Sequence, residues 1–495
     1  MSKSKEELEK PMLGYLKNIS FYSFGEVLNK SIQFLLLPLY AHYLTPADYG
    51  KLELTYLYGA VLVIFYGFII ENGYSRLFFD KKEAAFRDTL FGTSFFFKFG
   101  TGAVFLIISL LFSNYFAALL FNFAKGAHYL KLISISVFIK SLAEIPLKTL
   151  IVEKRAGRYV INNLLYLLFS LTSTVYFIVV LHLNIEGVLY GQIIGASIQL
   201  ITLLYSEWKS TFLSFSFTYL KGMLYFSLFL IPTQLATFVT YWSNRLFLQK
   251  FTSLEDLGTF SFGYKIASII PILLTGPIKK ASGPEIYELI DQPEACKKRI
   301  KQYTLIMLMF LTLFALALSI FAKELIMLMA AKSFASSYEV VFILSMGYVL
   351  IGMSGIVVTV IQISKKTWLI TITWFLSAIL NVVLNLLLVP KFGKAGATYA
   401  TMLSFLFILI LYFIFAEMVY KVRFEYVKYI LILVLVSASY CLTTVINSSW
   451  IVLNLLLKSA MLVLTTIFMI KCFVRTEDQL RLRNMLSSKL SYLKK

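Results

Sequence analysis

Charge and cysteine are both scarce in this sequence. Only 15% of its 495 residues are Asp, Glu, Lys or Arg, whereas a soluble protein carries about 25%. The three cysteines, Cys296, Cys441 and Cys472, lack the spacing of a metal or redox site. No paired acidic motif or metal-ligand cluster stands out either. These absences argue against a disulfide-stapled domain and against a soluble enzyme.

Hydrophobic residues make up 59% of the sequence, and apolar runs recur from end to end. A helix of about 20 such residues crosses a hydrocarbon core of about 30 Å. The sequence therefore predicts an all-α integral membrane protein with about fourteen transmembrane helices. The predicted spans are 19–42, 53–75, 90–113, 131–152, 159–182, 186–207, 223–246, 257–280, 302–322, 339–363, 367–389, 394–419, 426–447 and 450–473.

Basic residues outnumber acidic ones by 46 to 26, and the formal net charge is +20. Binding of nucleic acid is one explanation. The other is that membrane insertion leaves Lys and Arg in cytoplasmic loops. The basic loops lie on the side shared by both termini, which favours the second explanation. We expect a multi-pass protein of the bacterial inner (cytoplasmic) membrane with both termini in the cytoplasm and no nucleic-acid partner.

Two short motifs occur twice. Asp48-Tyr49-Gly50 follows the first predicted span, and Asp256-Leu257-Gly258 follows the seventh. Small residues four apart recur likewise, as Gly187, Gly191 and Gly195 and again as Gly396, Ala400 and Ser404. Such residues let helix backbones approach closely in lipid, so each trio predicts a packing face.

The repeat predicts two lobes of six helices, related by a pseudo-twofold axis along the membrane normal. The N-lobe covers 1–210 and the C-lobe 211–420. Residues 421–475 supply two further spans, and 476–495 form a basic amphipathic cytoplasmic tail. A cytoplasmic helix is expected over 285–301, between spans 8 and 9.

Charged residues inside membrane spans are costly and indicate function. The cations exceed the anions around the predicted interface of the repeats, which favours an anionic substrate bearing phosphate or carboxylate groups. The candidate binding cations are Lys30, Lys98, Lys140, Arg245 and Lys265.

Several of these charges have a second explanation. Glu26 and Lys30 stand four residues apart, as do Lys140 and Glu144, so these charges can pair along one helix face. Lys98 and Lys265 have no acidic neighbour at helical spacing. Arg245 could instead reach the outer interface as an anchor.

Two polar residues of span 11, Asn381 and Asn385, also lie four apart. They could coordinate a small cation or form a contact between helices, and the sequence favours neither.

The segments 37–50, 243–267 and 380–404 together resemble the polysaccharide flippases of the MOP (multidrug/oligosaccharidyl-lipid/polysaccharide) exporter superfamily. The resemblance implies two six-helix lobes and two extra C-terminal helices that hold a lipid tail. It also implies export of an undecaprenyl-pyrophosphate-linked oligosaccharide, with membrane lipids and other polysaccharide assembly proteins as further partners. No cofactor is implied beyond a coupling ion.

The coupling ion is H⁺ or Na⁺ in this resemblance. The lipid II flippases have a sodium site that includes span 11 carboxylate chemistry, but the matching positions here look like the neutral Asn381 and Asn385. Proton coupling through Glu26, Glu71 or Glu144 is the alternative. The family often has Asp-Arg at the end of span 7, where this chain has Asn244-Arg245.

The leading hypothesis is therefore a non-enzymatic flippase that works by alternating access in surface polysaccharide biosynthesis, of O-antigen, capsule or teichuronic type. A cation-coupled multidrug exporter of the same fold is one alternative, although its cationic substrates favour an acidic cavity. A membrane polysaccharide polymerase or ligase is the other, although no predicted outer loop is long enough for a catalytic domain.

Overall fold

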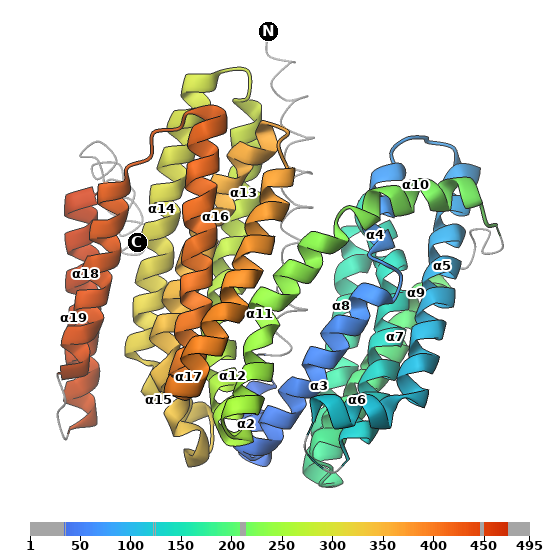
Figure 1. Ribbon diagram of the computed structural model, residues 1–495, viewed down its shortest axis with the longest axis horizontal. Helices are drawn as coiled ribbons and strands as arrows, with labels where there is room; N and C mark the ends of the chain where they lie inside the picture. The colour runs from blue at the N-terminus through green and yellow to red at the C-terminus, as the bar shows by residue number, and fades with distance from the viewer. Residues whose placement is uncertain are drawn as a thin grey trace, which may run out of the picture. The chain divides into compact units, whose positions relative to one another are not determined.

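The computed structural model describes residues 34, 36–121, 123, 125–207, 214–445 and 450–473. Three predicted features fall outside these ranges: most of the first span, the candidate residues Glu26 and Lys30, and the tail over 476–495. The described residues form helices joined by short loops, and none of them lies in a strand (Figure 1). The all-α class predicted from the sequence is confirmed.

The chain divides into two compact units. The first comprises residues 1–265, 329–337 and 371–404. Its helices are α2 (Leu37–Tyr43), α3 (Pro46–Phe65), α4 (Ile70–Leu77), α5 (Ala84–Leu111), α6 (Ser113–Leu120), α7 (Gly126–Val152), α8 (Ala156–Val175), η1 (Tyr176–Val180), α9 (Ile185–Glu207), α10 (Phe217–Leu228), α11 (Ile231–Phe251), most of α12 (Leu254–Ala267), η3 (Lys332–Ser337) and the middle of α17 (Trp368–Tyr420).

The second unit comprises residues 266–328, 338–370 and 405–495. Its helices are η2 (Pro271–Thr275), α13 (Gly276–Glu288), α14 (Pro293–Ile320), α15 (Ala322–Met329), α16 (Tyr338–Ile363), the ends of α17, α18 (Tyr426–Val445) and α19 (Ile451–Phe473). In this unit α14 packs against α16, α18 and α19. The lobe boundaries expected from the repeat remain a prediction.

Nine helices of the described chain are long and apolar enough to cross a membrane, or up to eleven when each of two bent pairs counts as one span. Helix α7 covers the predicted span 131–152. Helix α17 runs for 53 residues but is interrupted at Gly393, where φ is 54° and ψ is −130°. It therefore accommodates two predicted spans, 367–389 and 394–419. These helices are compatible with about fourteen spans.

Both bent pairs have a local cause. Between α3 and α4 the axis turns by 42°, where Gly67, Phe68 and Ile69 all have positive φ. Between α10 and α11 it turns by 43°, and Pro232 stands in the first turn of α11. A proline ring clashes with the carbonyl of the preceding turn and supplies no N–H, so a continuous helix cannot pass through it without bending.

The expected cytoplasmic helix over 285–301 is not a separate element. Helix α13 ends at Glu288 and α14 begins at Pro293, so the segment is the ends of two long helices and the loop between them. Proline is favoured in a first helical turn, where its missing N–H has no partner to lose. Pro293 starts α14 nine residues before the predicted span at 302. The prediction of a separate cytoplasmic helix over 285–301 is therefore wrong.

The duplicated hairpin turns contact each other at two glycines. A Cβ atom at Gly50 would lie 2.4 Å from the Leu254 carbonyl oxygen, and one at Gly258 would lie 1.8 Å from the Pro46 carbonyl oxygen. Leu254 and Gly258 are the repeat counterparts of Pro46 and Gly50, so the two contacts are equivalent. The sequence echo therefore corresponds to a pseudo-symmetric packing contact in space, which only glycine permits.

The two turns are also capped alike. Thr45 Oγ1 accepts a hydrogen bond from the Asp48 N–H at 3.1 Å, and Ser253 Oγ accepts one from the Asp256 N–H at 3.1 Å. A hydroxyl at this position satisfies one of the N–H groups left open at the start of a helix. The same sequence pattern thus starts α3 and α12 in the same way.

The small-residue trio of α9 packs against α8, as predicted. A Cβ atom at Gly191 would lie 2.1 Å from Thr174 Oγ1, and one at Gly195 would lie 2.6 Å from Ser170 Cβ. In α17, Ala400 is fully buried. The absence of larger side chains brings the backbones of α8 and α9 together.

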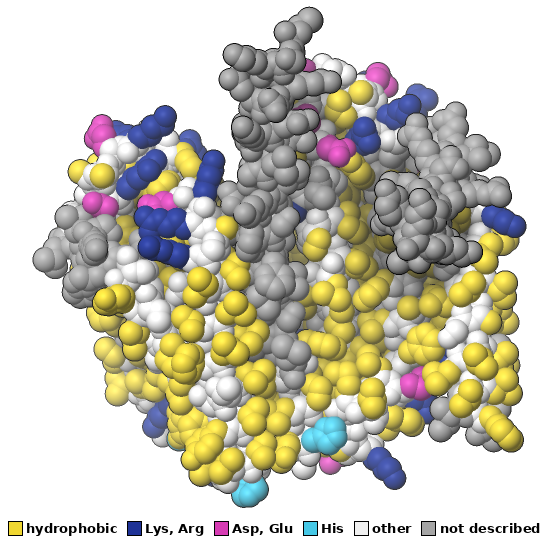
Figure 2. Space-filling model, turned by 180° about the vertical axis from the view of Figure 1, so that it is seen from behind, with side chains coloured by type: hydrophobic (Ala, Val, Ile, Leu, Met, Phe, Trp, Pro, Cys, Tyr) yellow, Lys and Arg dark blue, Asp and Glu magenta, His cyan; other side chains and the backbone are white. Residues whose placement is uncertain are grey.

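Hydrophobic side chains cover much of the surface seen in Figure 2. Large apolar residues are strongly exposed, for example Leu111 at 73% and Leu464 at 62%. Contiguous exposed apolar surface of this extent is typical of contact with lipid. The structure thus supports the multi-pass membrane assignment.

Candidate functional site

Arg245 and Glu53 form a buried ion pair in the first unit. Glu53 comes from α3 and Arg245 from α11, and Arg245 Nε donates to Glu53 Oε2 at 3.0 Å. The exposed fractions of the two side chains are 2% for Arg245 and 0% for Glu53. Arg245 therefore does not extend into the outer interface as an anchor, one of the two roles that the sequence allowed.

Lys265 shares the same carboxylate. Its Nζ lies 3.8 Å from Glu53 Oε1, and its side chain is 18% exposed. The three groups together carry two positive charges and one negative charge. Lys265 is the least buried of the three side chains.

Aromatic rings enclose the guanidinium. Arg245 Cζ lies 4.4 Å from the centroid of the Trp242 ring and 4.9 Å from that of Tyr264. Arg245 Nη1 also donates to the Tyr241 carbonyl at 3.0 Å. Cation–π contacts and hydrogen bonds compensate for lost hydration, which is how a charged group can be kept inside the protein.

Lys98 is held between two carboxylates from other helices. Its Nζ donates to Glu71 Oε2 at 2.9 Å. It also donates to Glu144 Oε2. The exposed fractions are 1% for Lys98, 16% for Glu71 and 34% for Glu144. Sequence spacing along α5 could not reveal these partners, because they come from α4 and α7.

The break between α3 and α4 makes room for this lysine. A Cβ atom at Gly67 would lie 2.7 Å from Lys98 Cγ, and Gly67 has a φ of 107°. Both the space and the backbone conformation therefore call for glycine. Lys98, Glu71 and Glu144, the Lys98 triad, therefore belong to the same local structure as the bend between α3 and α4.

Lys140 is exposed on α7, one turn before Glu144. Its Nζ lies 4.9 Å from the centroid of the Tyr166 ring. No ion pair within the described ranges includes it. Of the candidate cations that the structure describes, Lys140 and Lys265 are thus the two whose side chains are accessible, whereas Arg245 and Lys98 are buried.

Asn381 and Asn385 take part in a buried hydrogen-bond network between α11 and α17. Asn381 Oδ1 accepts from Ser243 Oγ at 2.7 Å, and Asn381 Nδ2 donates to Ser404 Oγ at 3.0 Å. Asn385 Nδ2 donates to Asn244 Oδ1 at 2.8 Å. These bonds favour the helix contact over the cation site, the two interpretations left open by the sequence.

Asn244 extends this network. Its Nδ2 donates to Thr401 Oγ1 at 2.6 Å. The neighbouring side chains of Asn244 and Arg245 therefore contact different helices: Asn244 bonds to α17, and Arg245 bonds to Glu53 of α3. A neutral amide fits the first position because it can both donate and accept.

Glu53 is the residue that sequence reasoning missed. The predicted span 53–75 begins at Glu53, so this residue stands at the edge of the span and not among the charges expected inside the membrane. One signal was present: it lies three residues after Gly50 of the duplicated motif, in a helix that the capping pattern starts at Pro46. Beginning the helix at the cap instead of at 53 places Glu53 within it.

The described residues contain no group of three or more His, Cys, Asp or Glu that could hold a metal ion. The carboxylates Glu53, Glu71 and Glu144 each face a cation instead. The arrangement suits electrostatic recognition of an anion and exchange of ion-pair partners.

Comparisons with known proteins agree on the fold and family. A family model described as "Polysaccharide biosynthesis protein" matches residues 39–339. The search of curated proteins found no match. The solved structure of the lipid II flippase MurJ in an inward closed conformation is similar over 93% of this chain and 100% of its own, with a TM-score of 0.74 and 11% identity.

Two solved structures of multidrug resistance MATE family transporters of the MOP superfamily are similar as well. The inward-facing one matches 79% of this chain and 94% of its own, with a TM-score of 0.64 and 13% identity. The outward-facing one matches 82% and 96%, with a TM-score of 0.58 and 14% identity. The family model confirms the resemblance to the polysaccharide family, and these likenesses show the fold. The chain belongs to the polysaccharide biosynthesis protein family and has the fold that MurJ and the MATE transporters share.

Proposed function

We propose that this protein flips an undecaprenyl-pyrophosphate-linked oligosaccharide from the cytoplasmic to the outer leaflet for surface polysaccharide biosynthesis. The family description supports a role with polysaccharide. The similar structures are named as a lipid II flippase and as multidrug transporters, which supports transport over catalysis. The accessible cations Lys140 and Lys265 support an anionic cargo over the cationic drugs of an exporter.

The observation that carries the proposal is the position of Lys265. Its side chain is 18% exposed, and its Nζ lies 3.8 Å from Glu53 Oε1, while the other oxygen of Glu53 is bonded to Arg245 at 3.0 Å. A pyrophosphate arriving at Lys265 competes with Glu53 for its ammonium group. Lys140 supplies a second accessible cation in the same unit.

Alternating access follows from competition for these cations. In the absence of cargo, Glu53 joins α3 to α11 and α12 through two cations. A bound pyrophosphate offers Lys265 a stronger partner than the shared carboxylate, so the link through Lys265 weakens when cargo is present. The two lobes then rock about the pseudo-twofold axis, and cargo release restores the link.

In this scheme the Lys98 triad couples transport to protons. Glu144 is its most exposed member at 34%, so it is the carboxylate that exchanges protons most readily with water. Protonation removes one of the two negative charges that hold Lys98. Sodium coupling through Asn381 fits less well, because its Oδ1 already accepts from Ser243 Oγ and Asn385 Nδ2. Asn385 Oδ1 is buried and has no hydrogen-bond partner among the described residues, so it is the oxygen of this network that a sodium ion would meet.

The lipid tail of the cargo stays in the bilayer beside the last two helices. An apolar cavity of about 380 Å³ lies along α18 and is lined by Ile430, Leu433 and Val434 among others. An apolar chain gains free energy by leaving water for such a surface. Other polysaccharide assembly proteins are proposed as partners that supply and use the cargo.

The test is a flipping assay on the purified protein in vesicles that hold the lipid-linked oligosaccharide. Lys265→Ala and Arg245→Ala are compared with Lys250→Ala, which removes an exposed cation of α11. We expect the Lys265 variant to transport roughly tenfold more slowly, the equivalent of one lost charge-assisted contact, and the control to transport normally. Normal transport by both Lys265→Ala and Arg245→Ala would remove the proposed binding site.

A further inference from the structure

The second unit contains a basic pocket with a volume of about 550 Å³. Four structural elements meet there: the start of α14, the strap of residues 421–425 that joins α17 to α18, the first turn of α18 and the end of α19. Its Lys and Arg residues are Lys297, Lys298, Lys301, Lys421, Arg423 and Lys428.

Buried and exposed side chains alternate along the strap. Val422 and Phe424 are buried at 0% and 7% and anchor the strap in the core. Lys421 and Arg423 are exposed and line the pocket. On α14, Lys297 and Lys301 are four residues apart and share a face.

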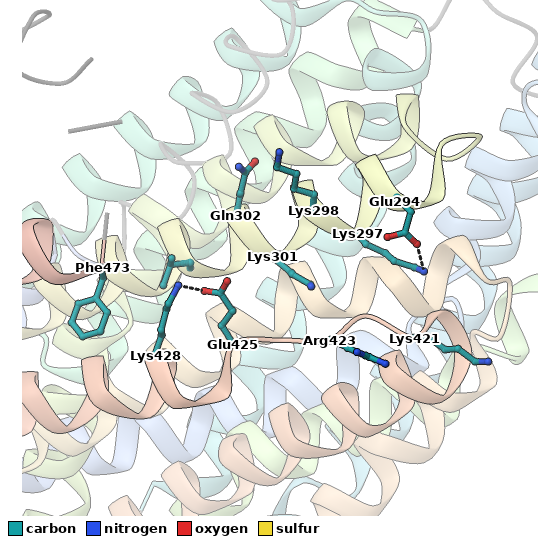
Figure 3. Close-up of a pocket in the computed structure, with 11 residues that line it drawn as sticks. Glu294, Lys297, Lys298, Lys301, Gln302, Lys421, Arg423, Glu425, Lys428 and Phe473 are labelled. Carbon is teal, nitrogen blue, oxygen red and sulfur yellow. Dashed lines mark hydrogen bonds and ion pairs between the residues drawn. The ribbon is translucent and has the colours of Figure 1, made fainter. Parts of the chain in front are cut away.

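Only part of this positive charge is balanced. Glu294 pairs with Lys297 at 2.8 Å, and Glu425 pairs with Lys428 at 2.6 Å. Figure 3 shows these two pairs on opposite sides of Lys301, with Arg423 below it. The remaining cations make no ion pair with any residue in the described ranges: Lys298, Lys301, Lys421 and Arg423.

Unbalanced cations in a concave site raise the local positive potential, and an anion there relieves their mutual repulsion. Positive charge near a membrane surface is common in cytoplasmic loops. Those loops do not usually bring several helix ends and a strap around one cavity. The pocket therefore has the shape of a binding site in addition to the charge.

The ligand also has an apolar part. Leu305 and Phe473 complete the lining of the pocket. The adjoining turn of α18 exposes Val427 by 71% and Ile430 by 59%, as expected of helices that face lipid. Ile430 belongs to the apolar cavity along α18 as well. A phosphate in the basic pocket thus lies next to a surface suited to its hydrocarbon chain.

We propose that this pocket binds the phosphate-bearing headgroup of a membrane lipid. The binding site belongs to the second unit and does not depend on which cargo the protein moves. Arg423 is suited to a bidentate contact with phosphate, and Lys301 supplies a point charge beside it. The lipid is either a bulk anionic phospholipid or a polyprenyl phosphate, which share this chemistry.

Native mass spectrometry of the purified full-length protein tests the proposal. The probes are phosphatidylglycerol, zwitterionic phosphatidylcholine, a polyprenyl monophosphate and inorganic pyrophosphate. We expect either anionic lipid to be retained more strongly than phosphatidylcholine. Stronger retention of the polyprenyl monophosphate would identify a polyprenyl phosphate as the ligand of the pocket. Stronger retention of phosphatidylglycerol would identify a bulk anionic phospholipid.

Two double variants separate the pocket from general positive charge. Lys301→Gln with Arg423→Gln removes two pocket cations, and Lys365→Gln with Lys366→Gln removes two exposed cations of the same unit outside it. Each Lys or Arg near an anionic lipid surface contributes about fivefold in affinity, so we expect the pocket variant to bind roughly 25-fold more weakly. The control is expected to bind like the wild type.

Arg423→Lys is expected to keep most of the binding, which distinguishes lost charge from misfolding. Equal losses in both double variants would overturn the proposal, because they would reflect net charge alone. Equal retention of phosphatidylcholine and phosphatidylglycerol would overturn it too. So would pyrophosphate binding without retention of either anionic lipid, since the site would then take a free anion.

Discussion

The guanidinium of Arg245 and the carboxylate of Glu53 lie 3.0 Å apart, and both side chains are buried. They come from α11 and α3, which are 192 residues apart in the chain at these positions. Each group loses its hydration inside the protein, so each depends on the other. The contact joins two helices from different repeats of the sequence, at the cluster that also includes Lys265.

Neutralising Glu53 leaves Arg245 as a buried charge without its carboxylate, and neutralising Arg245 leaves Glu53 without its close partner and with Lys265 at 3.8 Å. We therefore expect Glu53→Gln and Arg245→Gln each to lower the free energy of unfolding by about 3–5 kcal/mol. The double variant is expected to recover much of this loss, because no buried charge remains. Thermal unfolding of the purified protein in detergent measures all three, with the exposed Lys250→Gln as control. Additive losses in the double variant would contradict the pairing.

The contact of the two hairpin turns predicts a strong effect of a single methyl group. Gly258→Ala places a Cβ atom 1.8 Å from the Pro46 carbonyl oxygen, so the backbones of α3 and α12 must separate. We expect a loss of roughly 1–3 kcal/mol, as for overpacked sites. Gly100→Ala is the matched control, since nothing lies within 4 Å of its Cβ position.

The control is expected to be neutral or to gain about 0.5–1 kcal/mol, because alanine is favoured over glycine inside a helix. Expression level and melting temperature of both variants measure the difference. Equal stability of the two proteins would show that the turns do not pack as described.

The Lys98 triad predicts a pH-dependent defect. In Lys98→Met, Glu71 and Glu144 lose the cation that both contact, and two carboxylates face each other when ionised. We expect a loss of about 3–5 kcal/mol at pH 8 and a smaller loss at pH 5, because acid protonates the unpaired carboxylates. Melting temperatures across this pH range provide the measurement.

Glu144→Gln in the Lys98→Met background is expected to restore stability at pH 8, because one negative charge is then removed. Lys131→Met, which neutralises an exposed lysine of α7, serves as control and is expected to show no pH trend of its own. A Lys98→Met defect of the same size at both pH values would contradict the electrostatic account.

The Asn network predicts a packing role with no response to sodium. Asn385→Ala leaves Asn244 Oδ1 without its donor at 2.8 Å. An unsatisfied buried polar group costs about 1–3 kcal/mol, and we expect a destabilisation of that size. Melting in sodium and in potassium should give the same result for the wild type. Stabilisation by sodium that Asn385→Ala abolishes would instead assign these residues to ion coupling.

Most of the helices could be predicted because their signal is local. Thirteen of the fourteen spans predicted from hydrophobic runs lie on helices of the described chain, and the first is described only at its end, in α2. The prediction of a separate helix over 285–301 failed because α13 and α14 both continue beyond their apolar parts into polar ends. Hydropathy reports what lies in lipid and not where a helix ends.

The candidate site was predicted less completely, because its contacts join distant segments. Arg245 and Lys265 were identified as charges in apolar surroundings, but their shared partner Glu53 was not. Helical spacing also gave Lys98 no acidic neighbour, although Glu71 and Glu144 both contact it. Partners on other helices have no fixed sequence separation, so spacing rules cannot find them.

The sequence by itself determined the membrane class, the positions of the spans and the duplicated hairpin, since these depend on local hydropathy and on repeated residues. It also identified charged residues inside apolar segments. Only the tertiary structure decided how those charges are used. Folding buries Arg245 against Glu53 and encloses Lys98 between two carboxylates, yet leaves Lys265 partly accessible. The reason is physical: the free energy of a buried charge depends on the groups within a few ångströms, and packing alone brings those groups together.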